Sequence, residues 1–128
     1  KKEVVIMIVF NIQKYATMEN PTPGKTYKET LLGIDNAESV CGVFAIIQPG
    51  EKGGAYHVHS EREHLILIIK GDGVEIIEGK NNPVKTGDVL FRPAREKHTL
   101  ITESDQEMRY MGFCSCTPGD PDREELEE

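Results

Sequence analysis

Residues 57–78, HVHSEREHLILIIKGDGVEIIE, contain the pattern that decides the fold. The run from His64 to Lys70 is apolar on both faces, which is typical of a strand whose sheet is covered on both sides. The glycines at Gly71 and Gly73 allow the chain to reverse tightly into a second strand over residues 74–78. The stretch therefore predicts an antiparallel hairpin with an interior first strand.

Short apolar runs separated by glycine- and proline-containing turns continue on both sides of this hairpin. They recur roughly every 8–12 residues, which is typical of an all-β sandwich or barrel. No segment before residue 117 has an amphipathic helical period, and residues 79–83, GKNNP, are expected to form a turn. We therefore expect one all-β domain over residues 1–116 and an acidic tail over 117–128. The apolar or extended runs are residues 4–10, 26–34, 40–48, 55–59, 64–70, 74–78, 89–92, 99–102 and 108–114.

The negative charge is concentrated at the C-terminal end. The net charge of −7 comes from 15 Lys and Arg against 22 Asp and Glu. Residues 117–128 hold six of these acids and one of the bases, so the remainder of the chain is nearly neutral. A nearly neutral body without a basic stripe argues against nucleic acid and against anionic membranes as partners. We expect the tail to be solvated.

The apolar runs and the cysteines indicate the expected cellular location of the protein. The longest apolar run, residues 4–10, is too short for a membrane span and lacks a small-residue cleavage site after it. The three cysteines are an odd number without the spacing of a disulfide framework, which favours a cytoplasmic location. Cys114 and Cys116 are expected to be small apolar residues on one strand face, with a redox or metal role as the alternative.

All four histidines stand at junctions between turns and strands. His57 and His59 are two positions apart, so on one strand both point to the same face. His64 begins the next strand and His98 begins another, so a barrel would bring the four imidazoles together. Imidazole is a neutral ligand that suits Zn, Cu, Fe, Ni and, less well, Mn. The pattern favours one divalent metal ion over a chance surface arrangement.

Two segments resemble the paired motifs of the cupin family. Residues 57–71, HVHSEREHLILIIKG, resemble the first motif, and residues 87–98, GDVLFRPAREKH, resemble the second in its glycine, proline and histidine spacing. The flanking strands fit the rest of a barrel, so the resemblance covers most of the chain. It implies a single-domain cupin, a double-stranded β-helix or jelly-roll barrel. It also implies a homodimer formed by sheet packing or by exchange of an N-terminal strand.

The position of the motif glutamate leaves the fourth metal ligand open. Counting back from the motif glycine reaches His64, whereas counting forward from the His-x-His pair reaches Glu63. Strand parity from the hairpin favours His64, and a bulge would favour Glu63. The resemblance implies the ligands His57, His59 and His98, with His64 or Glu63 as the fourth. The sequence also departs from the motifs at Glu51, Arg95 and Thr102, which replace two glycines and an asparagine.

The fourth ligand determines the chemistry. Four neutral imidazoles leave a dication with its full charge, which makes it a stronger Lewis acid than a site with one carboxylate. With His64 as ligand, the catalytic group would be metal-bound water or substrate, with Glu63 as a base at the rim. The resemblance implies a small-molecule enzyme of the dioxygenase or isomerase/lyase type. The alternative is a non-catalytic module that binds a sugar or an organic acid.

Arg92, Arg95 and Arg109 are candidates for binding an anionic group of the substrate through a forked contact. Arg95 lies in the loop that leads to His98. Arg95 and Arg109 are therefore predicted as substrate-binding residues, with exposed arginines at strand edges as the alternative.

Overall fold

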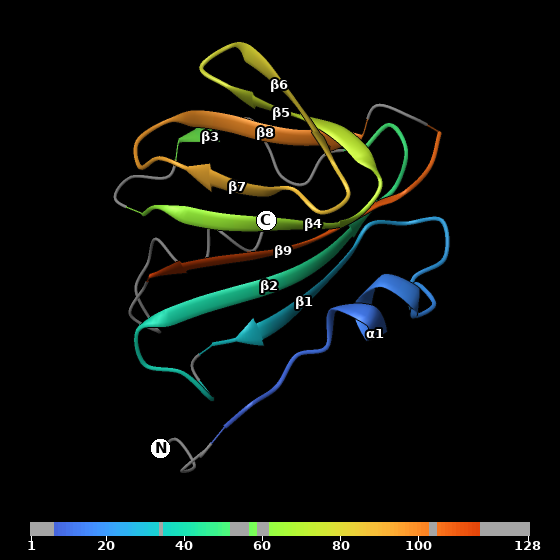
Figure 1. The fold of residues 1–128 in the computed structure, drawn as a ribbon, viewed down its shortest axis with the longest axis vertical. Helices are drawn as coiled ribbons and strands as arrows, with labels where there is room; N and C mark the ends of the chain where they lie inside the picture. The colour runs from blue at the N-terminus through green and yellow to red at the C-terminus, as the bar shows by residue number, and fades with distance from the viewer. Residues whose placement is uncertain (1–6, 34, 52–56, 59–61, 103–104, 116–128) are drawn as a thin grey trace.

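Two antiparallel sheets form the body of the computed structural model (Figure 1). The structure describes residues 7–33, 35–51, 57–58, 62–102 and 105–115, with the backbone alone at 57–58. The larger sheet has the strand order β1-β2-β9-β4-β7, and the smaller sheet has the order β3-β8-β5-β6. The all-β prediction is confirmed. The strands are β1 (Tyr27–Leu32), β2 (Val40–Ile47), β3 (His57–Val58), β4 (His64–Lys70), β5 (Asp72–Ile77), β6 (Lys80–Lys85), β7 (Val89–Arg92), β8 (Lys97–Thr102) and β9 (Met108–Ser115).

β4 and β5 follow one another at Gly71, whose φ of 99° is in the region that favours glycine, but the two strands do not pair with each other. β4 pairs with β7 and β9 in the larger sheet, and β5 pairs with β6 and β8 in the smaller sheet. The predicted antiparallel hairpin is therefore wrong, and Gly71 is a corner at which the chain passes from one sheet to the other. Ile66 and Ile68 of β4 point between the sheets and pack in one cluster with Leu100 and Met108. The predicted interior strand is therefore confirmed for its inner face. On the outer face the cover is incomplete, because Leu65 is 55% exposed.

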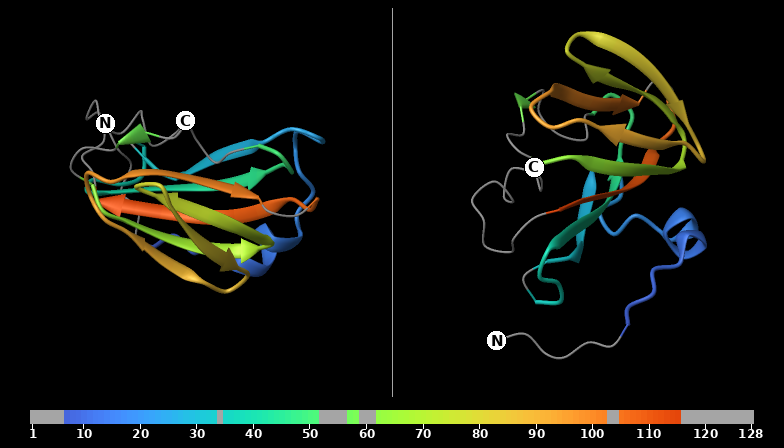
Figure 2. Two further views of the ribbon diagram at one scale, coloured as in Figure 1. Left: turned by 90° about the horizontal axis from the view of Figure 1, so that it is seen from above. Right: turned by 60° about the vertical axis from the view of Figure 1, so that its left-hand side comes forward.

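A short helix, α1 (Ile12–Thr17), lies against the outer face of the larger sheet, where the sequence predicted no helix (Figure 2). Tyr15 packs on Phe44 with ring centroids 4.8 Å apart and shares a core cluster with Ile69 and Met111. The side chain of Asn11 caps the helix by accepting hydrogen bonds from two backbone N–H groups of its first turn. Six residues are too few to give a helical period, which explains the error.

The predicted turn over residues 79–83 is also wrong, because most of it belongs to strand β6. β6 is at an edge of the smaller sheet, where the missing N–H of Pro83 need not face a partner. Val84 is the buried residue of β6 and packs in the cluster between the sheets. In Figure 1 the β5–β6 hairpin is at the top of the molecule, and α1 is beside the lower part of the larger sheet.

Several predictions concern parts of the chain outside the described residues. These include the domain boundary at residue 116, the acidic tail 117–128, the first part of the run 4–10, and the residues His59 and Cys116. Within the described residues, Met7 and Val9 are exposed and belong to no strand. No helix in the described part of the chain has the length and apolar character needed to cross a membrane.

Candidate metal centre

His64 and His98 approach each other from different sheets. His64 is the first residue of β4 in the larger sheet, and His98 is in β8 of the smaller sheet. Both side chains are buried, and their ring centroids are 6.3 Å apart. With metal–nitrogen distances of ~2.1 Å, two imidazoles on one ion have ring centres separated by up to roughly 6.4 Å. That limit corresponds to two rings on opposite sides of the ion, whereas a tetrahedral angle would bring the ring centres to roughly 5.2 Å. The observed separation therefore places the two side chains close together, at the wide end of what a shared ion allows.

The other two predicted ligands are less fully described. The backbone of His57 lies in β3, where its Cα pairs with that of His98. His59 is outside the described residues. Among the described residues, no group of three or more His, Cys, Asp or Glu side chains is gathered in a way that could hold a metal. The four-histidine set stays a prediction, of which the structure brings two side chains together.

Glu63 and His64 differ in exposure as strand parity predicts. The side chain of Glu63 is exposed, whereas that of His64 is 7% exposed. His64 pairs with Arg92 of β7 on one side and with Cys114 of β9 on the other. Directly opposite residues share a face of the sheet, so these three side chains are neighbours on the inner face.

A small cavity of about 50 Å³ adjoins His64. A space of this size holds about four water molecules, so it suits a ligand with few non-hydrogen atoms. Its polar lining groups come from the inner face of the larger sheet, and the rest of the wall is small or apolar. The lining residues are Cys41, Gly42, Val43, His64, Ile66, Arg92, Tyr110, Gly112 and Cys114.

Arg92 forms a forked ion pair with Glu75 across the two sheets. Its Nε donates to Glu75 Oε2 at 2.6 Å, and its Nη2 donates to Oε1 at 2.9 Å. The side chains are 11% and 4% exposed, respectively. Asn82 of the edge strand donates from Nδ2 to the backbone oxygen of Glu75 at 3.1 Å. The pair therefore links β7 to β5 beside the cavity, with little access to water.

Tyr110 contributes a phenol to the same cavity. Burial raises its pKa above the usual value of 10.0, Arg92 partly opposes this rise, and Glu75 adds to it. The phenol therefore keeps its proton at neutral pH and can donate a hydrogen bond.

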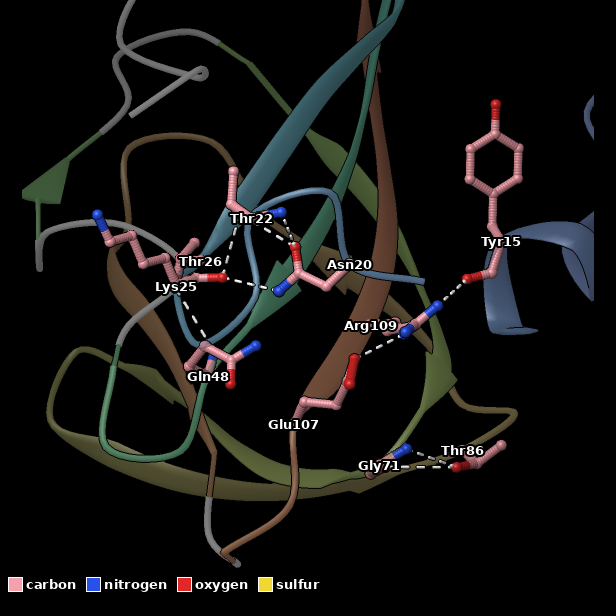
Figure 3. Close-up of polar contacts among 10 residues, drawn as sticks. All are labelled: Tyr15, Asn20, Thr22, Lys25, Thr26, Gln48, Gly71, Thr86, Glu107 and Arg109. Carbon is pink, nitrogen blue, oxygen red and sulfur yellow. Dashed lines mark hydrogen bonds and ion pairs between the residues drawn. The ribbon is translucent and has the colours of Figure 1, made fainter. Parts of the chain in front are cut away.

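Arg109 contacts the N-terminal segment and its neighbour Glu107 (Figure 3). Its Nε donates to Glu107 Oε2 at 2.7 Å, and its Nη1 donates to the backbone oxygen of Tyr15 at 2.8 Å. The residue is 4% exposed and lies near the end of β9 opposite to Cys114. These contacts give Arg109 a structural role in holding α1, and a contact between Arg109 and the substrate stays a prediction.

Arg95 lies in the turn between β7 and β8, and its side chain is exposed. Its φ of 62° is in the left-handed region that favours glycine. This backbone conformation explains why a glycine is expected at the corresponding place of the second motif. The sequence prediction of a substrate contact at Arg95 has no further support from the structure.

Cys114 is buried and is not part of a disulfide, and it pairs in register with Cys41 of β2. Cys41 is disulfide-bonded, which contradicts the expectation of cysteines without disulfides on which the cytoplasmic location was based. Both residues line the cavity. The interpretation of Cys114 as a small residue on a buried face is therefore consistent with its place.

Comparison with known proteins identifies relatives of this chain. The family model for the cupin domain matches residues 43–114, which contain His57, His64 and His98. A curated relative, the oxalate-binding protein of Thermotoga maritima, is 29% identical over 65 residues. The match covers 51% of this chain and 53% of that relative, so this chain spans about half the length of the curated relative it matches.

Solved structures share the fold at low sequence identity. A protein with a double-stranded β-helix domain from Klebsiella pneumoniae superposes with a TM-score of 0.69 at 18% identity, over 90% of this chain and 93% of that chain. A predicted oxalate decarboxylase from Thermotoga maritima superposes with a TM-score of 0.62 at 22% identity, over 70% of this chain and 79% of that chain.

Proposed function

This chain belongs to the cupin domain family, and from that premise we propose that it binds one divalent metal ion and acts on a small organic molecule. The chemistry would be of the dioxygenase type or of the Lewis-acid type found in isomerases and lyases. One observation carries the proposal. Two buried imidazoles from different sheets have ring centroids 6.3 Å apart, and one of them, His64, lines a cavity with a guanidinium and a phenol.

The proposed ligands are His57, His59, His64 and His98. His57 is included because its backbone pairs directly with His98, and directly paired positions lie on one face of a sheet. His59 is two positions further along the chain, where a continued strand would present the same face. His64 is preferred to Glu63 because the glutamate is exposed and the histidine is buried.

The metal would be Zn, Fe, Mn, Ni or Cu, all of which accept imidazole ligands. When bound by neutral histidines, such an ion supplies a strong Lewis acid and open positions for ligands. The chain itself contributes Tyr110, a protonated phenol whose pKa burial raises above its ordinary value, so that it stays a hydrogen-bond donor above neutral pH as well. Ile66 and Val43 give the wall an apolar part that excludes water.

A second candidate function is metal-dependent binding without turnover. None of the described residues that line the cavity is a carboxylate that could act as a general base. The relative from Thermotoga maritima is named an oxalate-binding protein, which suggests a small organic acid as ligand for this alternative.

Metal content tests the proposed site directly. Wild-type protein should contain about one divalent ion per chain by elemental analysis, and His57→Ala/His98→Ala protein should contain none. His64→Ala should weaken metal binding, whereas the matched variant Glu63→Gln should retain the ion because its side chain is exposed. Full metal occupancy in the His57→Ala/His98→Ala variant would refute the proposed metal site.

A turnover screen then separates the two functions. Protein loaded with Fe(II), Mn(II) or Zn(II) would be incubated with enediols, phenols, sugar acids and small dicarboxylic acids while O₂ uptake and product mass are followed. Turnover that disappears in the His57→Ala/His98→Ala variant supports the enzyme. Tight binding without turnover by any metal form supports the binding module.

We also propose that two copies of the chain associate through the uncovered part of the larger sheet. Leu65, Val89 and Phe91 are 55%, 65% and 56% exposed and lie on the outer face of β4 and β7. Leu65 pairs with Phe91, so the exposed side chains form one continuous apolar surface. Two copies of such a surface can cover each other about a two-fold axis.

A further inference from the structure

The geometry points to Arg92 as the residue that binds a carboxylate group of the ligand, with Glu75 as the residue that positions it. This inference rests on the proposed function, because it names the ligand class of the same site. Neither residue is one of the proposed histidine ligands. Arg92 is on β7 and Glu75 is on β5, and neither strand carries a proposed ligand.

Arg92 is directly next to His64, one of the proposed metal ligands. Arg92 and His64 are direct partners in the antiparallel ladder of β7 and β4. Partners of this kind have Cβ atoms about 4.5–5.5 Å apart on the same face. Both side chains line the cavity, so a ligand of a few atoms that reaches His64 also reaches the guanidinium.

Glu75 engages one edge of the guanidinium and leaves another. The Nε and Nη2 groups each donate one hydrogen bond to the carboxylate, whereas a guanidinium has five N–H donors in a fixed plane. Among the described residues, Glu75 is the group bonded to the guanidinium of Arg92, so the Nη1 edge can serve a ligand. By contrast, Arg109 uses its Nε for Glu107 and its Nη1 for Tyr15.

Charge and hydrogen bonding in the cavity favour an anion. The Arg92–Glu75 pair is neutral as a unit, and neutral histidines leave the charge of a bound dication uncompensated. The protonated phenol of Tyr110 adds a second donor to the same space. A small carboxylic acid provides acceptors for the guanidinium and the phenol at one end and an oxygen ligand for the ion at the other. Planar carboxylates also match the fork of arginine.

The test compares acids with their neutral amides. Binding of oxalate and glycolate, and of oxamide and glycolamide, would be measured by calorimetry on Mn(II)-loaded protein. The test variant is Glu75→Gln/Arg92→Met, because removing both partners avoids a buried charge without its counterion. The matched control is Glu107→Gln/Arg109→Met, which makes the same change of charge on the outer face. Arg92→Lys keeps the charge but loses the fork.

We expect the test variant to keep its metal content, and its acid affinity should fall by at least about tenfold more than its amide affinity. The control variant should bind the acids like wild type, and Arg92→Lys should lie between the two. Equal losses for acids and amides, equal losses in test and control variants, or no binding of either acid to wild type would overturn the inference.

Metal content separates this inference from the proposed function. Wild-type protein that holds no metal but binds oxalate through Arg92 would refute the proposed function and keep the inference. Full metal occupancy with acid binding that does not depend on Arg92 would refute the inference and leave the proposed function standing.

Discussion

The two faces of the larger sheet each bury an arginine next to a glutamate, and the two pairs have different surroundings. On the inner face, Arg92 and Glu75 are 11% and 4% exposed and border the cavity beside His64. On the outer face, Arg109 and Glu107 are 5% and 26% exposed, and Arg109 also holds a backbone oxygen of Tyr15. A buried arginine is therefore not by itself evidence for a ligand site. What matters is whether its donors are already used by the protein.

The largest expected effect is the loss of the inner carboxylate. Glu75→Gln leaves the guanidinium of Arg92 buried without its counter-charge and should lower the free energy of unfolding by about 3–5 kcal/mol. Glu107→Gln should cost less than about 1 kcal/mol, because water reaches that side chain. Urea unfolding at neutral pH measures both. Equal losses would mean that the two faces bury their ion pairs equally.

The next effect concerns the outer arginine. Arg109→Met removes a charge-assisted hydrogen bond to the backbone of α1 and should cost about 1.5–3 kcal/mol. Amide exchange should become faster in residues 12–17, while metal content stays at the wild-type level. Lys80→Met, which removes an exposed cation from an edge strand, serves as the control. Unchanged exchange in α1 would show that Arg109 does not hold the helix.

A smaller effect concerns pH and the phenol of the inner face. Burial raises the pKa of Tyr110 in the folded protein, whereas the unfolded chain ionises near pH 10. The stability that this group contributes is therefore present below pH 10 and is lost as the pH rises above it. At pH 11 the loss is at most about 1.4 kcal/mol, which is one pH unit of linkage.

The measurement is the free energy of unfolding between pH 8 and 11 for wild type and Tyr110→Phe. The variant should lose less stability over this range. Some decrease should remain, because Tyr15 and Tyr27 also have raised pKa values, the first mainly through burial and the second mainly through its hydrogen bond to Glu29. Parallel curves for the two proteins would show that Tyr110 titrates like an exposed tyrosine.

The sequence was sufficient to predict the burial of His64, because the turn at Gly71 sets the parity of β4. It was wrong about the hairpin, because two strands joined by a tight glycine turn can also belong to different sheets, as β4 and β5 do. It was not sufficient to place Arg109. Both faces of β9 carry apolar residues, so alternation along MRYMGFC does not distinguish the inner face from the outer one. Pairing with β2 and β4, which are distant in sequence, determines that the side chain of Arg109 lies on the outer face.

Glu75 was missed for a related reason. Its partner Arg92 is on a strand of the other sheet, and no local pattern joins the two residues. The available signal was a single charge inside the apolar run of residues 74–77, since a charge in such a run is expected to have a buried partner. Helix α1 and strand β6 were missed because one is six residues long and the other is a polar edge strand.

The smallest effect on folding, and the sharpest test of the outer face, concerns its uncovered part. Leu65→Ser/Phe91→Ser should change the unfolding free energy of a monomer by about 0.5 kcal/mol or less, because both side chains are more than half exposed. The same change should abolish a dimer that buries these side chains, since polar groups would replace the centre of its apolar surface. Sedimentation over a concentration series measures the association, with Val40→Ser, an exposed apolar residue of β2, as the control. A dimer that persists in the double variant, or a wild-type protein that stays monomeric throughout the series, would show that a second copy does not cover this surface.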